Sequence, residues 1–237
     1  MVAAASRSNM LLRVGTAAVL IAAVLLVLLA GSFWVYVALA VVLGAGLIEF
    51  RNLTRAMQTP APLWILFPLS YGLLLRDHLP NWASVTFLLA VVSVVGLGAM
   101  VFLRNWRASL ARWALAIGGS LWLGLLLSFY ASLYFRHQPD PNRQGSWLVL
   151  AVFVTIWIGD TAAMLAGMRY GRHRFFSGIS PKKTVEGAIA EVLVSLVFFS
   201  IAGPFLGVGF PHNVLLGLLI GIAAELGDLV ESQAKRT

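Results

Sequence analysis

Long runs of apolar residues alternate with short polar connections along the whole chain. Eight such runs cover residues 14–30, 32–50, 63–75, 83–103, 113–135, 147–168, 185–206 and 214–230. A helix of about 20 apolar residues crosses the hydrocarbon core of a bilayer. The runs show no alternation with a period of two, and an open sheet in lipid leaves backbone groups without hydrogen bonds. The pattern therefore predicts an all-α polytopic membrane protein with about eight transmembrane helices.

The composition agrees with lipid as the main solvent of this chain. Hydrophobic residues make up 60% of the 237 positions and charged residues only 11%, whereas a soluble domain carries about 25% charged residues. A chain this apolar would expose large apolar patches in water. The absence of cysteine excludes disulfides and thiolate metal sites.

The net charge of +8 lies in the short connections between apolar runs. If the N-terminus is cytoplasmic and eight helices alternate, 14 of the 17 Lys and Arg fall inside, which leaves only Arg76, Arg136 and Arg143 outside. Cytoplasmic loops of membrane proteins carry such an excess of bases. We therefore expect both termini in the cytoplasm, and we expect the bases to reflect topology rather than nucleic-acid binding.

Acidic residues are concentrated in the C-terminal third. Only Asp77 and Asp140 fall in predicted outside loops, and the other seven of the nine acids lie within predicted helices or near their cytoplasmic ends. A carboxylate at such a place usually faces a cavity, a partner or an ion. Asp160 lies midway along its run, where a metal or substrate ligand is the favoured interpretation. The alternative is a helix-packing carboxylate bonded to a nearby hydroxyl.

The connection 169–184 contains a predicted phosphate site. Ser180, Lys182, Lys183 and Thr184 lead into a helix expected to begin near residue 185, and free amides at a helix N-terminus bind anions. Glu186 in the first turn suits the same dipole. The alternative is an ordinary basic loop that contacts lipid headgroups.

The last predicted helix carries a polar stripe. Glu225, Asp228, Ser232 and Lys235 are spaced by three, four and three residues and so share one face. Two carboxylates, a hydroxyl and an ammonium suit a divalent cation with a phosphate, because Mg²⁺ takes one or two carboxylates plus substrate phosphates. A helix end that becomes polar in water would explain the residues after Ser232, but not Glu225 and Asp228.

Residues 147–237 resemble the CDP-diacylglycerol synthase (phosphatidate cytidylyltransferase) family. The matching blocks, in the family's order, are Asp160 and Thr161, then 179–184 with Glu186 and Gly187, then 227–229 with Glu231, Ser232, Lys235 and Arg236. Residues 1–146 resemble the family only in their general character as transmembrane helices. The chain is therefore divided into N-terminal transmembrane helices, 1–146, and a C-terminal transmembrane catalytic region, 147–237.

The resemblance implies an integral membrane enzyme of phospholipid biosynthesis, expected in a bacterial cytoplasmic membrane. It would join CTP and phosphatidate into CDP-diacylglycerol and pyrophosphate, with Mg²⁺, and would form a homodimer. The implied metal ligands are Asp228 and Asp160, supported by Glu225. The remaining implied site residues, which bind phosphates or act in catalysis, are Ser180, Lys182, Lys183, Thr184, Glu186, Ser232, Lys235 and Arg236.

The sequence departs from the family pattern at several positions. Ala190 and Glu191 replace a glycine pair, Met164 and Met168 replace an aromatic residue and an arginine, and Glu225 stands where an amide is common. The family pattern continues beyond Lys235 and Arg236 with further ligands. The resemblance therefore implies a C-terminally incomplete chain, and it supports the family function without supporting catalysis by this chain alone.

Two other functional classes are left open by the residues. A membrane transporter also uses intramembrane acids and helix-start anion sites, although the sequence shows no repeat between its halves. A related CTP-using lipid enzyme, such as a polyprenol kinase or an archaeal-type lipid cytidylyltransferase, would use the same kinds of residue.

Overall fold

The computed structural model describes residues 15, 19–80, 82, 84–100, 102, 106–135, 144–176, 178 and 180–234. Within these residues the chain is helical, and the strand-like pairing is one isolated bridge between Arg174 and Thr184. The predicted all-α class is confirmed.

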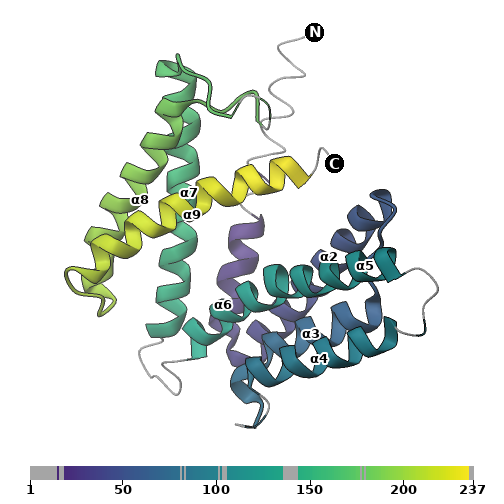
Figure 1. The fold of residues 1–237 in the computed structure, drawn as a ribbon. Coiled ribbons are helices and arrows are strands. Elements are labelled where there is room, and N and C mark those ends of the chain that lie inside the picture. The colour runs from purple at the N-terminus through teal and green to yellow at the C-terminus, as the bar shows by residue number, and fades with distance from the viewer. Residues whose placement is uncertain are drawn as a thin grey trace. The chain divides into compact units, whose positions relative to one another are not determined.

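The chain folds as two compact units. Unit 1 comprises Met1–Thr54 and Thr59–Phe135, and unit 2 comprises Arg55–Gln58 and Arg136–Thr237. The helices of unit 1 are α2 (Ser32–Ala56), α3 (Leu63–Leu74), η1 (Arg76–His78), α4 (Val85–Met100), α5 (Trp106–Gly119), η2 (Ser120–Leu125) and α6 (Leu126–Phe135), as Figure 1 shows. Unit 2 contains α7 (Gln144–Tyr170), α8 (Val185–Phe205) and α9 (His212–Ala234). The expected division into regions 1–146 and 147–237 rests on function and stays a prediction.

Five helices in the described part of the chain are long and apolar enough to cross a membrane. They are Ser32–Ala56, Ser109–Phe135, Gln144–Tyr170, Val185–Phe205 and His212–Ala234. Three shorter apolar helices, Val19–Ala30, Leu63–Leu74 and Val85–Ala99, coincide with the other predicted runs. The membrane character of the chain is thus supported by five helices, whereas the count of eight spans stays a prediction.

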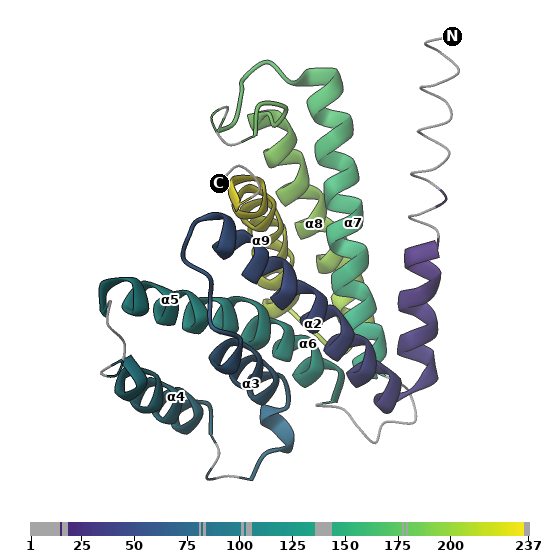
Figure 2. The same ribbon diagram turned by 90° about the vertical axis from the view of Figure 1, so that its right-hand side faces the viewer.

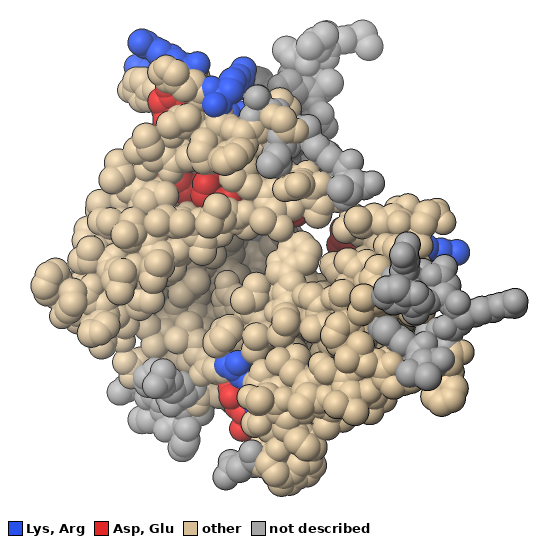
Figure 3. Space-filling model, viewed as in Figure 1, with Lys and Arg blue, Asp and Glu red and all other residues tan. Residues whose placement is uncertain are grey.

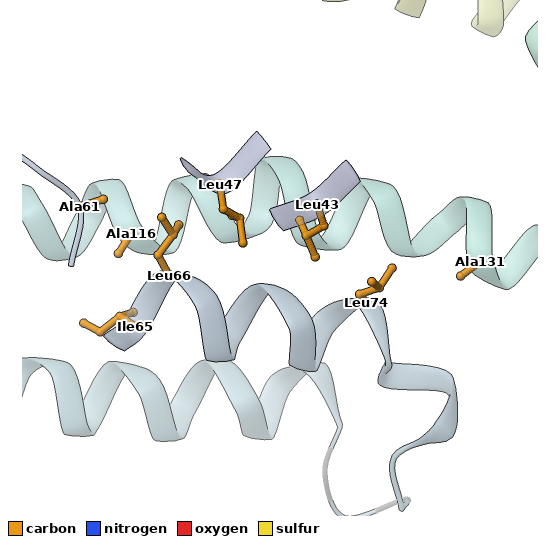
Figure 4. Close-up of a cluster of buried hydrophobic side chains, with 8 residues drawn as sticks. All are labelled: Leu43, Leu47, Ala61, Ile65, Leu66, Leu74, Ala116 and Ala131. Carbon is orange, nitrogen blue, oxygen red and sulfur yellow. The ribbon is translucent and has the colours of Figure 1, made fainter. Parts of the chain in front are cut away.

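Unit 1 packs around an apolar core between α2, α3 and the continuous helix formed by α5, η2 and α6. Figure 4 shows its buried side chains, which are Leu43, Leu47, Ala61, Ile65, Leu66, Leu74, Ala116 and Ala131. The six-residue π-helical segment η2 lies against α3, where the Ser120 hydroxyl donates to the Leu66 carbonyl at 3.2 Å. A side chain at Gly124 would come within 2.7 Å of the Ser70 Cα atom, so a small residue is required there.

Unit 2 is a layer of three helices in which α8 packs against both α7 and α9 (Figures 1 and 2). Glycines let the helix backbones approach closely. An added Cβ at Gly187 would lie 2.9 Å from the Ala163 carbonyl oxygen, and one at Gly221 would lie 2.9 Å from the Val192 Cα atom. These contacts hold the three helices at the spacing that defines the candidate site.

Candidate functional site

The loop between α7 and α8 is fixed by backbone hydrogen bonds at both of its ends. The Val185 amide donates to the His173 carbonyl, and the Phe175 amide donates to the Lys183 carbonyl, each at 3.0 Å. Thr184 is the N-cap of α8, and its hydroxyl accepts from the Gly187 amide at 3.2 Å. The helix therefore begins where the sequence predicted, and the loop holds the backbone of its lysines in place.

A cavity of about 870 Å³ lies between this loop and the three helices of unit 2. Its acidic lining residues are Asp160 on α7, Glu191 on α8, and Glu225, Asp228 and Glu231 on α9. Its basic and hydroxyl lining residues come from the loop and are Arg174, Ser180, Lys182, Lys183 and Thr184. Figure 3 shows that Asp and Glu side chains are few on a face that is mostly uncharged. Most acids of the C-terminal third thus line one polar cavity.

Lys183 forms the central ion pair of this cavity. Its ammonium lies 2.8 Å from Glu225 Oε1 and 2.8 Å from Asp228 Oδ2. The Lys183 side chain is 18% exposed, the Glu225 side chain 9% and the Asp228 side chain 56%. Burial alone would lower the pKa of the ammonium, but the hydrogen bonds to Asp228 and Glu225 outweigh burial and raise the pKa of Lys183. The ammonium is therefore charged at neutral pH.

Glu191 is a site residue that the sequence analysis did not include among its ligands. It is only 3% exposed, and its Oε1 atom has no hydrogen-bond partner among the residues that the structure describes. Buried polar atoms in proteins are nearly always paired. The available signal was the carboxylate itself, which stands in an apolar helix where the resembling family has a glycine. The position of Glu191 in the cavity lining was not readable without the fold.

Seven of the predicted site residues come together in the cavity. They are Asp160, Ser180, Lys182, Lys183, Thr184, Glu225 and Asp228. Ser232 and Glu186 are not among the lining residues, and the Glu186 carboxylate instead contacts His173, at 3.2 Å from its amide nitrogen and 2.7 Å from Nδ1. Lys235 and Arg236 lie outside the described residues. The functional roles of all these residues stay predictions.

The cavity offers oxygen ligands for a divalent cation. Among the described residues, no group of three or more His, Asp or Glu side chains is arranged as a complete metal site. Mg²⁺ commonly needs only one or two carboxylates, with substrate phosphates and water completing its shell. Glu225 and Asp228 are one helical turn apart on α9, and the unpartnered Glu191 oxygen lines the same cavity. This donor set fits Mg²⁺ together with a phosphate ligand.

One family of known proteins matches this chain over most of its length. The model of the cytidylyltransferase family matches residues 11–237. The chain belongs to the cytidylyltransferase family. The match extends over both units, including the N-terminal helices, which the motifs of the C-terminal third could not identify.

Curated relatives of this cytidylyltransferase share about a quarter of its residues. The phosphatidate cytidylyltransferase of Staphylococcus saprophyticus is 25% identical over 215 residues, which are 90% of this chain and 76% of that protein. The phosphatidate cytidylyltransferase of Staphylococcus aureus strain COL is 28% identical over 204 residues, which are 84% of this chain and 72% of that protein. A protein of the same name from Staphylococcus epidermidis is 27% identical over 204 residues.

Proposed function

We propose that this protein is a phosphatidate cytidylyltransferase that makes CDP-diacylglycerol and pyrophosphate from CTP and phosphatidate. The observation that carries the proposal is the polar cavity of unit 2, where loop bases and helix carboxylates meet in a member of the cytidylyltransferase family. The relatives named phosphatidate cytidylyltransferase support the choice of lipid.

In the proposed reaction, a phosphate oxygen of phosphatidate attacks the α-phosphorus of CTP. A new P–O bond forms there, the bond from that phosphorus to the bridging oxygen breaks, and pyrophosphate leaves with the electron pair. Enzymes accelerate such transfers mainly by positioning the reactants and neutralising charge. The chain supplies positioning through the capped start of α8 and charge neutralisation through its basic side chains.

The residues have distinct proposed roles in binding the phosphates. Lys182 and Lys183 neutralise phosphate charge, while Ser180 and the first turn of α8, capped by Thr184, donate hydrogen bonds. Lys235 and Arg236, together with Ser232, are proposed to act on the same phosphates from the end of α9.

Mg²⁺ is the proposed cofactor, held by Asp228 and Asp160 with support from Glu225. Bound there, Mg²⁺ would neutralise the charge that develops on the transferring phosphate. The three carboxylates would hold the ion in the cavity, and they need not exchange protons with the substrates.

The topology follows from the same proposal. We propose eight spans with both termini in the cytoplasm, because this places the loop bases on the side where CTP is available. Phosphatidate would reach the cavity from the lipid, in a bacterial cytoplasmic membrane. The functional unit is proposed to be a homodimer.

Product formation in membranes tests this function. Membranes containing the chain are incubated with CTP labelled at the α-phosphate, phosphatidate and Mg²⁺. A second form, extended beyond Thr237 by the family's further motif, is assayed in parallel, and the form that makes product is called the active form below. We expect labelled CDP-diacylglycerol that disappears with EDTA. If neither form makes it, or if a polyprenol or archaeal-type lipid is the preferred acceptor, the proposal is wrong.

A further inference from the structure

The ammonium of Lys183 pairs with Glu225 and Asp228, two carboxylates that the proposed function assigns to a divalent cation. Its ammonium lies 2.8 Å from an oxygen of Glu225 and 2.8 Å from an oxygen of Asp228. A divalent cation bound by the same two oxygens would occupy the position of the ammonium. Two cations at such short distances repel each other strongly inside a protein. The ion pair and a metal at these oxygens therefore exclude each other.

The charge of the cavity favours replacing the ammonium by a stronger cation. Asp160, Glu225 and Asp228 line the cavity, and the Lys183 ammonium contacts two of them, Glu225 and Asp228. One ammonium balances only part of the charge of these two carboxylates, and the buried Glu225 carboxylate is costly without counter-charge. A divalent cation would bring twice the charge to the same place.

The backbone of the loop does not need to move for this exchange. The Lys183 carbonyl accepts from the Phe175 amide, and the Lys183 amide donates to the Ser180 carbonyl at 3.2 Å. The ammonium stands on a flexible four-carbon stem. Rotation of the side chain alone can move it from the carboxylates toward a phosphate bound beside Ser180 and the start of α8.

We propose that Lys183 is an internal counter-ion that blocks the cation position until the phosphates of a nucleotide draw it away. This inference rests on the proposed function for the identity of the nucleotide. Without CTP, Lys183 keeps Glu225 and Asp228 paired and the divalent cation binds weakly. With CTP, the ammonium turns to the phosphates and the two carboxylates bind the cation. Cation and nucleotide then strengthen each other's binding by the same factor.

The test measures binding of Mn²⁺, a paramagnetic substitute for Mg²⁺, to the full chain purified in detergent. Electron paramagnetic resonance reports free Mn²⁺ with and without CTP, and no phosphatidate is present, so no reaction occurs. The informative variant is Lys183→Met, which removes the ammonium but keeps an apolar stem. Lys183→Arg keeps the charge. Arg112→Met is the control, because Arg112 is an exposed base on α5 of unit 1 to which no role is assigned.

Lys183→Met is expected to bind Mn²⁺ about tenfold more tightly than the unaltered chain in the absence of CTP, a typical coupling between two sites. Lys183→Arg and Arg112→Met should bind nucleotide-free Mn²⁺ as the unaltered chain does. Adding Glu225→Gln to Lys183→Met should remove the gain. If the gained binding survives in that double variant, it belongs to another site and counts against the proposal.

The proposal is overturned if Lys183→Met binds nucleotide-free Mn²⁺ no more tightly than the unaltered chain. It is equally overturned if the unaltered chain binds Mn²⁺ as tightly without CTP as with it, a measurement that needs no variant. Lys183→Gln is expected to give the same result as Lys183→Met. It is used in place of Lys183→Met if that variant aggregates. The result is separable from the proposed function, because loss of CDP-diacylglycerol formation leaves these binding constants measurable.

Discussion

Units 1 and 2 are both built from apolar helices and both bury hydroxyl groups, but among the described residues only unit 2 also buries carboxyl groups. In unit 1 the buried hydroxyls of Ser120 and Ser128 donate to the carbonyls of Leu66 and Leu125. In unit 2 the carboxyl groups of Glu191 and Glu225 are buried. A hydroxyl satisfied by a nearby carbonyl needs no further partner, whereas a carboxylate among membrane helices needs a counter-charge. Buried carboxyl groups therefore distinguish unit 2, to which the proposed function assigns the reaction, from unit 1.

The largest effect should come from an acid of unit 2. Asp228→Asn keeps the shape of the side chain but removes its charge from the proposed cation position. Removing one group that stabilises transition-state charge costs about 10²–10³ in kcat, and we expect a loss of that order in CDP-diacylglycerol formation by the active form. The measurement is the initial rate at saturating CTP and Mg²⁺.

Asp77→Asn in unit 1 is the control for Asp228→Asn. Asp77 is paired with Arg76 and Ser132, and none of these three residues is assigned to substrate. Its rate should stay within twofold of the unaltered protein. Equal losses of rate in Asp77→Asn and Asp228→Asn would contradict the assignment of the reaction to unit 2.

The second-largest effect is expected on stability, and it comes from the close packing of the helices in unit 2. Gly221→Ala places a Cβ atom 2.9 Å from the Val192 Cα atom, and overpacking of this kind costs about 1–3 kcal/mol. Gly98→Ala on α4 of unit 1 meets no atom within 4 Å and should stabilise by about 0.5–1 kcal/mol through helix propensity. Thermal unfolding in detergent should thus shift in opposite directions. A shift in the same direction for both variants would contradict the tight packing of α8 and α9.

A loop base should have a smaller effect, which appears in substrate binding. Lys182→Ala is expected to raise the KM for CTP about fivefold with little change in kcat, because an exposed charge contributes only about 1 kcal/mol. The effect should shrink at high salt, since mobile ions screen exposed charges. Arg112→Ala, an exposed base on α5 of unit 1, should leave the KM unchanged. An unchanged KM in both would argue against phosphate binding by Lys182.

The smallest effect is expected for Glu191→Gln. The family resemblance places a glycine at this position, so the chemistry does not require a carboxylate there. Replacing one carboxyl oxygen beside Glu225 by an amide nitrogen should weaken Mg²⁺ binding only about threefold, or less than 1 kcal/mol. The half-saturating Mg²⁺ concentration of the active form checks this, and a complete loss of activity would make Glu191 an essential ligand.

The sequence predicted the elements of unit 2 better than their contacts. The run 185–206 and its hydroxyl-rich approach indicated α8 and its start, and Thr184 is indeed the N-cap. The stripe of Glu225 and Asp228 followed from helical spacing alone. Their bonds to Lys183 did not, because Glu225 lies 42 positions from that lysine along the chain. Pairing across such a separation depends on how α8 packs on α9.

Other features were not predictable for physical reasons. The π-helical segment Ser120–Leu125 has no distinctive spacing, and it depends on the approach of Gly124 to Ser70. The family resemblance places Glu186 among the substrate residues, and this role stays a prediction. Its contact with His173 was not predicted, because that contact depends on the path of the loop. Local pattern therefore predicts helices, while side-chain partners require the fold.

The most direct test of the central claim is equilibrium binding of labelled CTP to the 237-residue chain in membranes with Mg²⁺. The unaltered chain and the Asp77→Asn variant should bind CTP saturably, with displacement by pyrophosphate. Asp228→Asn should lose most of this binding, because the nucleotide would lack its bridging cation. Saturable binding that is equal in all three proteins, or absent from all of them, would contradict a nucleotide site in the cavity of unit 2.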